Sequence, residues 1–175
     1  MTEARILTGF RFDVSLMAER PGSGELIDAR AGFQEVGGLE IEMDVTELIE
    51  GGRNDGTVRR PGRAKHATLV FKRGMFLPGQ NSGDADRKAD VSFWRWIQNC
   101  IAGELPVRRC KGVIELNTTV SAQSGVVPVA SWTFERGLPV KVKGPDLNAR
   151  TGEIALEELH IAHEGLRLNL PGGAG

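Results

Sequence analysis

The strongest constraint on the fold of this chain is an alternation of apolar and polar residues that recurs along its length. Apolar residues occupy every second position from Phe10 to Leu16, and again from Leu39 to Val45, with polar residues between them. Successive side chains of a strand point to opposite faces of its sheet, whereas an α-helix repeats about every 3.6 residues. The pattern therefore predicts long strands with one buried face each.

Further apolar runs extend this prediction toward the C-terminus. Strands are expected over residues 69–72, 111–120, 128–134 and 138–143. The 23 glycines gather mostly in short groups between apolar runs, as tight turns require, which favours a β-rich fold. Residues 153–168 are ambiguous, because good helix formers fill a segment that also alternates on either side of Glu157-Glu158. If this segment is a strand, we expect a β-bulge at those two residues.

One helix is predicted over about residues 90–102. Asp90 can accept a hydrogen bond from the first free N–H groups, and Gly103 is a suitable left-handed stop. Between these ends, one apolar stripe consists of Phe93, Trp94, Ile97, Cys100 and Ile101. Trp94 and Trp96 straddle the helix, so one is expected in the core and the other partly exposed.

Two segments contain little to bury. Residues 50–65 read EGGRNDGTVRRPGRAK and are expected to form a mobile loop in the monomer. Residues 77–88 read LPGQNSGDADRK and form a polar linker or an insertion before the predicted helix.

Length and composition favour a single soluble domain covering residues 1–175. Hydrophobic residues make up 40% of the chain and charged residues 26%, an ordinary globular composition. The formal net charge of -1 provides no overall field toward nucleic acid or membranes. The sequence has no apolar run of about 18 residues and no secretory signal at its start. We therefore expect synthesis in the cytoplasm and no membrane insertion.

The most enzyme-like feature is the group His160, His163 and Glu164, since two imidazoles near a carboxylate can ligate a metal. Its spacing matches neither the zincin motif nor the inverted form. In a strand the two histidines would point to opposite faces, so structural or solvent-facing histidines are favoured over a small metalloenzyme. Cys100 and Cys110 are interpreted as reduced thiols or buried side chains. P-loop and nucleophile-elbow motifs are missing, so we expect no cofactor, no metal and no enzymatic activity.

Four cations, Arg59, Arg60, Arg63 and Lys65, lie close together in the segment 50–65. They could bind phosphates, as in a nucleic-acid-binding β-barrel, or they could simply be solvated. A third interpretation is a docking arm whose cations meet an acidic face of a neighbouring subunit. That face would consist of Glu40, Glu42, Asp44 and Glu47.

Ten short stretches form an ordered set that spans most of the chain. They are residues 10–14, 31–40, 50–54, 60–65, 71–74, 93–96, 132–134, 139–142, 144–148 and 157–166, which read FRFDV, AGFQEVGGLE, EGGRN, RPGRAK, FKRG, FWRW, WTF, PVKV, GPDLN and EELHIAHEGL. Each stretch is weak alone, but their order is specific. The set resembles the contractile phage tail-tube protein family, which includes inner-tube proteins of extracellular contractile injection systems and phage tail-like particles.

The resemblance implies a β-sandwich or barrel with one flanking helix, and it favours a strand for residues 153–168. It implies a structural protein that forms hexameric rings, which stack inside a contractile sheath as a hollow conduit for effector cargo or DNA. Baseplate and cap proteins would be further partners, and the particle could be released outside the cell. Residues 50–65 would contribute to subunit contacts, which places at interfaces Glu50, Gly51, Gly52, Arg53, Asn54, Arg59, Arg60, Arg63 and Lys65.

Two segments depart from the family pattern. Residues 77–88 look longer than usual before the helix, and residues 121–128 look like an inserted loop. Baseplate tube-initiator proteins share much of the same pattern. The sequence is therefore compatible with the repeating tube subunit and with an initiator ring at one end.

Overall fold

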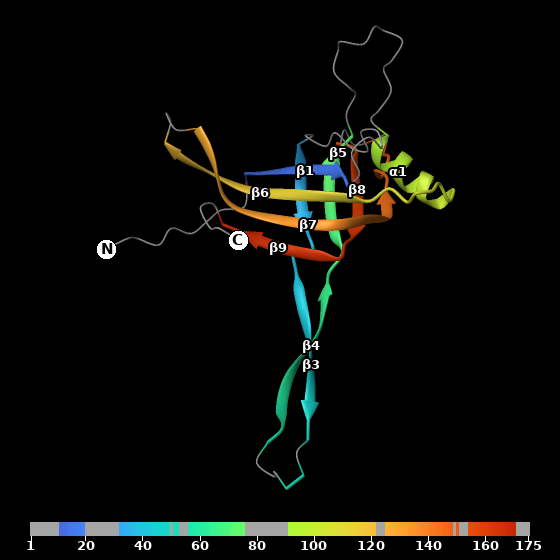
Figure 1. The fold of residues 1–175 in the computed structure, drawn as a ribbon. Helices are drawn as coiled ribbons and strands as arrows, with labels where there is room; N and C mark the ends of the chain where they lie inside the picture. Colours follow the sequence, from blue (N-terminus) through green and yellow to red (C-terminus); the bar gives the residue numbers. More distant parts are fainter. Residues whose placement is uncertain are drawn as a thin grey trace.

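The computed structural model describes residues 11–19, 32–49, 51–52, 56–75, 91–121, 125–148, 150 and 154–170. Within these ranges the chain forms nine strands and one helix (Figure 1). In chain order they are β1 (Phe12–Ala18), β2 (Phe33–Gly37), β3 (Ile41–Leu48), β4 (Val58–His66), β5 (Leu69–Gly74), α1 (Ser92–Ile101), β6 (Cys110–Ser121), β7 (Gly125–Lys143), β8 (Leu156–Ala162) and β9 (Gly165–Asn169). The mainly β fold with a flanking helix confirms the predicted fold class.

Seven strands form one antiparallel sheet in the order β1-β6-β7-β8-β5-β2, with β9 also paired to β7. β7 is 19 residues long and takes part in two halves of this sheet. Its residues 131–135 pair with β9 in one half, and its residues 138–143 pair with β8 in the other. Between these halves lie Arg136, with φ of 55°, and Gly137. Figure 1 shows the consequence, which is that β1, β6, β7 and β9 run across β5 and β8. The sheet thus folds over itself and encloses a core.

The core lies between the two halves of the folded sheet and beneath α1. Its members are Val14, Leu16, Leu69, Phe71, Phe93, Trp96, Cys110, Ile114, Phe134, Leu159, Ile161 and Leu166. Trp96 is 1% exposed, and its indole N–H donates to the Arg108 carbonyl at 2.9 Å, so burial leaves its polar atom satisfied. These contacts fix α1 on the body.

The helix confirms its predicted position, and one residue of its predicted apolar stripe is not buried. It begins at Ser92, and the Val91 cap position makes no side-chain hydrogen bond; the predicted Asp90 cap lies outside the described residues. Gly103 has φ of +75° and confirms the predicted stop. Trp96 is buried and Trp94 half-buried, as expected of the pair, but Ile101 is 79% exposed. The stripe was therefore wrong at Ile101, which does not belong to the core or to the residues packed against it.

Residues 156–162 form strand β8, which resolves the ambiguity of the C-terminal segment. The bulge expected at Glu157-Glu158 is wrong, since β8 pairs with β5 in one continuous register from Leu156 to Ile161. The irregularity lies instead in the opposite neighbour β7, between Pro139 and Lys141. Glu157 keeps its place in the register because its carboxylate binds Arg73 across the strands.

The two segments that depart from the family pattern have different outcomes. Residues 77–88 lie outside the described residues. In the segment 121–128, Ser121 is the last residue of β6, and residues 125–128 are the first residues of β7. Ser121 pairs with Gly125 between these two strands.

In the described part of the chain, no helix is both long and apolar enough to cross a membrane.

Both cysteines are free thiols, and Cys110 is buried in the core. Burial raises the pKa of the Cys110 thiol to about 12, and burial also raises the pKa of Cys100. Since only the thiolate reacts, alkylation of Cys110 at pH 8 should be roughly 1,000-fold slower in the native protein than in urea. Mass spectrometry of labelled protein over time measures this ratio. Equal labelling of Cys110 in native and unfolded protein would contradict the buried placement.

Candidate subunit interface

The most distinctive part of the structure is a two-stranded arm made of β3 and β4. These strands pair only with each other among the described elements, and Figure 1 shows them extending away from the folded sheet. The prediction of a mobile loop is thus wrong for residues 58–65, which lie in β4. Backbone hydrogen bonds to β3 can hold this polar segment as a strand although it has little to bury.

The arm carries the described members of the predicted interface. Arg59, Arg60, Arg63 and Lys65 lie in β4, while Gly51 and Gly52 lie in a turn near the tip, where Gly52 has φ of +93°. Glu50, Arg53 and Asn54 lie outside the described residues. The structure therefore gathers the six described residues of the predicted interface on one projecting element.

One face of the arm is apolar and exposed. In the β3–β4 register, Ile41, Met43 and Val45 share a face with Ala64 and Pro61, and these five residues are here called the apolar face. Ile41 is 55% exposed, Met43 54% and Val45 57%. The predicted alternation in β3 is confirmed, but its expected burial is not, because the arm leaves the body before any element can cover this face.

Charged pairs tie the two strands of the arm together. Lys65 Nζ lies 2.6 Å from Asp44 Oδ1, and Arg59 Nε lies 3.4 Å from Glu47 Oε1. Two of the four cations thus meet two of the predicted acidic residues within the same chain. All four side chains are exposed, so these pairs add about 1 kcal/mol or less each and mainly fix the register of the hairpin.

Two glycines permit close backbone contacts in the arm and at its root. At Gly62, within the bulge of β4, an added Cβ would lie 2.7 Å from the Asp44 carbonyl oxygen. At Gly38, which has φ of +81°, an added Cβ would lie 2.1 Å from the Thr68 carbonyl oxygen. The chain therefore leaves the body and returns to it through a crossing that has no room for a side chain.

The histidines suspected of metal binding have other partners. His160 Nε2 lies 3.4 Å from Glu158 Oε2, whereas the His163 ring nitrogens face the carbonyl oxygens of Gly165 and Ala67. Across the described ranges, no three or more His, Cys, Asp or Glu side chains are grouped so that they could hold a metal ion.

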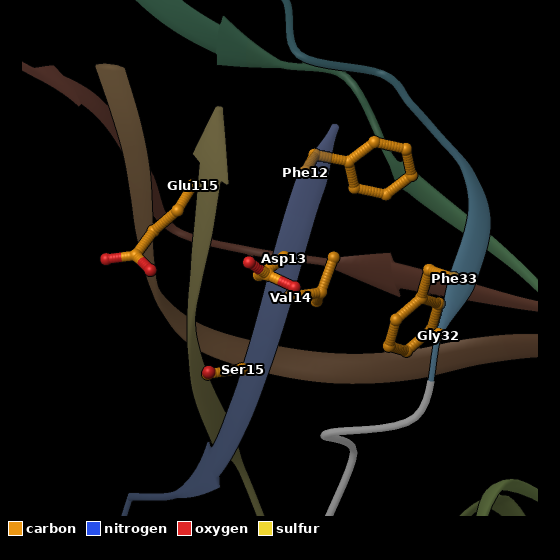
Figure 2. A pocket seen from close by; sticks show the side chains of 7 residues that line it. All are labelled: Phe12, Asp13, Val14, Ser15, Gly32, Phe33 and Glu115. Atoms are coloured by element: carbon orange, nitrogen blue, oxygen red, sulfur yellow. The ribbon is translucent and has the colours of Figure 1, made fainter. Parts of the chain in front are cut away.

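A hollow of about 290 Å³ opens between the edge strands β1 and β2. Its lining consists of Phe12, Asp13, Val14, Ser15, Gly32, Phe33 and Glu115. Figure 2 shows the Phe12 ring extending from β1 toward β2, with the Asp13, Ser15 and Glu115 side chains on the β6 side. Asp13 accepts a hydrogen bond from Asn117 at 2.6 Å, so this carboxylate has a structural partner.

The folded antiparallel sheet and the exposed hairpin define a structural protein that presents a surface for association. Residues 8–167 match the family model described as T4-like virus tail tube protein gp19. This chain therefore belongs to the T4-like tail tube protein family, as the sequence resemblance predicted, and its role is that of a structural tube protein.

Solved structures share the fold over nearly the whole chain. A chain of the anti-feeding prophage baseplate, six-fold symmetrised, has a TM-score of 0.69 and 20% identity, covering 97% of this chain and 99% of that one. A chain of the PVC sheath–tube complex, an extracellular contractile injection system in the extended state, has a TM-score of 0.68 and 18% identity, covering 94% and 92%. A chain of the anti-feeding prophage tube-terminating cap has a TM-score of 0.68 and 20% identity, covering 97% of this chain and 95% of that one. A search among curated proteins finds no match.

Proposed function

We propose that this chain is the repeating inner-tube subunit of a contractile injection apparatus. Six copies close into a ring, and rings stack into a hollow conduit for effector cargo or DNA. Family membership supports the tube, and the six-fold baseplate with the same fold supports the ring size. The role is mechanical rather than catalytic, since the tube supplies a stiff passage while a sheath contracts around it.

The strongest support is the arm, whose apolar face is more than half exposed at each β3 position. We infer that this face docks on a second copy of the chain, because a tube must be built from repeated contacts between copies. Covering an apolar side chain of this size contributes about 1.5–3 kcal/mol when burial is complete. Repetition around a ring adds such contacts into a stable assembly.

The remaining partners follow from the same proposal. A sheath, baseplate proteins and a cap would contact the tube, in line with the assemblies that contain the similar structures. The subunit would be made and assembled in the cytoplasm, and the finished particle could act outside the cell. A tube-initiator ring of the baseplate is the second candidate, because one similar chain belongs to a baseplate.

A nucleic-acid-binding role for the cation cluster is less well supported. Asp44 and Glu47 already lie against Lys65 and Arg59, which reduces the charge that this face offers to phosphates. Binding to DNA that falls steeply with salt, and that is lost on replacing Arg60 and Arg63 with glutamine, would favour this role instead.

The assembly proposal is tested by placing one carboxylate on either face of the arm. Val45→Asp should prevent rings and tubes, because burying an unpaired charge weakens each contact about 10- to 100-fold. Thr46→Asp is the matched control, since Thr46 is the next residue and points to the other face, opposite Arg60. Negative-stain electron microscopy and light scattering at high concentration measure both variants beside the wild type.

Wild-type and Thr46→Asp proteins should form rings or tubes, whereas Val45→Asp should stay monomeric with an unchanged melting temperature. Assembly of Val45→Asp at the wild-type concentration would exclude the apolar face from the contact. Monomers in all three samples, even after addition of preformed baseplates of the same system, would overturn the tube proposal itself.

A further inference from the structure

Two of the three histidines of the chain meet at the root of the arm. His66 is the last residue of β4, and His163 lies between β8 and β9. Their ring centroids are 5.1 Å apart with a tilt of 42°, and His163 also lies 5.9 Å from the Phe134 ring. The pair therefore connects the arm directly to the body.

The hydrogen bonds of His163 bridge the same two parts. Its Nδ1 lies 3.0 Å from the Gly165 carbonyl oxygen, and its Nε2 lies 3.1 Å from the carbonyl oxygen of Ala67, the residue after β4. Carbonyl oxygens only accept, and a neutral imidazole has one N–H, so it can donate to one of them at a time. An imidazolium could donate to both, so these two carbonyl groups favour the charged ring and act against the effect of its burial.

Burial opposes a charge at this position. Desolvation is the largest influence and lowers the pKa of His163 below 6.5, and repulsion from His66 lowers it further, against the raising effect of the two carbonyl groups. The buried Nδ1 of His66 has no hydrogen-bond partner among the described residues. A proton on that nitrogen would thus lack an acceptor there.

The nearby carboxylates are directed elsewhere. Glu164 adjoins His163 in sequence, but its oxygens accept from Arg109 at 3.0 Å and from Arg136 at 2.5 Å. Glu40 contributes its backbone carbonyl to the Ala67 N–H at 3.4 Å, while its side chain is exposed. Neither acid is among the groups that shift the pKa of His163.

We propose that His66 and His163 form an acid-sensitive joint, which holds the arm against the body at neutral pH and loosens it in acid. The direction of the pH dependence of this contact follows from the lowered pKa of His163. The stabilising contact is complete above pH about 6.5, the unfolded value, and is lost as the pH falls through the lower folded value. The joint is a property of the single chain and does not depend on assembly.

Hydrogen exchange of dilute, monomeric protein tests the joint. Between pH 7.5 and 5.0, after correction for intrinsic exchange rates, protection of residues 60–68 should fall about tenfold relative to β6. In His66→Gln the fall should be smaller, because the repulsion from His66 is removed while the desolvation of His163 remains. His160→Gln is the matched control, since His160 contacts Glu158 away from the arm, and it should behave like wild type.

Nuclear magnetic resonance titration of the His163 ring provides a second readout that does not require the arm to open. Its midpoint should lie below 6.5 in the wild type and rise in His66→Gln. Equal loss of protection in wild type and His66→Gln, no loss in the wild type, or an unchanged His163 midpoint would each overturn the joint.

Discussion

Replacing Glu157 with leucine is expected to destabilise the folded monomer by about 3–5 kcal/mol, because it leaves a buried guanidinium without its carboxylate. Arg73 and Glu157 face each other across β5 and β8, with Arg73 Nε 2.6 Å from Glu157 Oε1. Their side chains are 1% and 0% exposed. Water therefore cannot reach the guanidinium to replace the Glu157 carboxylate, so loss of this ion pair is costly.

The surroundings of Arg73 also depend on this ion pair. Its guanidinium lies 3.7 Å from the centre of the Phe93 ring, and Nη2 donates to Ser92 Oγ at 3.2 Å. Both contacts come from the first turn of α1. Loss of Glu157 should thus loosen the attachment of the helix as well as the β5–β8 pair.

Urea unfolding of dilute protein measures this effect, and two further variants make it specific. Arg73→Leu combined with Glu157→Leu should recover much of the loss, since it removes both buried charges together. Glu35→Gln breaks the exposed pair of Lys72, the residue next to Arg73, and should barely move the unfolding midpoint. A Glu157→Leu midpoint close to that of Glu35→Gln would show that the pair is not buried in solution.

Gly38→Ala should have the second large effect, on the attachment of the arm. A left-handed backbone at a non-glycine residue costs about 1–3 kcal/mol. The added methyl group would also lie 2.1 Å from the Thr68 carbonyl oxygen, a backbone atom that cannot turn aside. Relief requires the two strands at the root to separate, so the arm should change position as well as stability, with a further cost of about 1–3 kcal/mol.

The neighbouring Gly37 supplies the control for this substitution. An added Cβ there meets nothing within 4 Å, and Gly37 is not among the residues with positive φ. Gly37→Ala should therefore fold and assemble as the wild type does, while Gly38→Ala should lose thermal stability and ring formation. Melting curves and electron microscopy of the two variants measure the difference, and equal behaviour would exclude a tight crossing at the root.

Local sequence patterns predicted those elements whose partners lie on the body. Leu69 and Phe71 in β5 alternate as expected and are fully buried, and Gly103 ends the helix in a left-handed conformation. Both outcomes depend on short-range chemistry, which is the direction of successive side chains in a strand and the freedom of glycine at positive φ. The family resemblance added the strand at residues 156–162, which helix propensity alone would have missed.

The candidate interface was predicted in location but not in form. The cation-rich composition of residues 58–66 suggested a loop, since a strand with nothing to bury has no local signal. Its pairing with β3 is a contact between separate segments, so it could be found only in the fold. The Arg73–Glu157 pair did leave a signal, because each residue continues the buried alternation of its strand, but charged residues are usually assigned to the outer face.

By itself, the sequence determined where β1, β3 and β5 are extended, which of their side chains share a face and where the helix stops, because these properties depend on neighbours a few residues apart. The tertiary structure alone decided which of those faces is covered. The alternation in β5 and the alternation in β3 look alike in sequence, yet one is buried in the core and the other stands exposed on the arm. Burial depends on what packs opposite a face, and for β3 no described element of the same chain lies there.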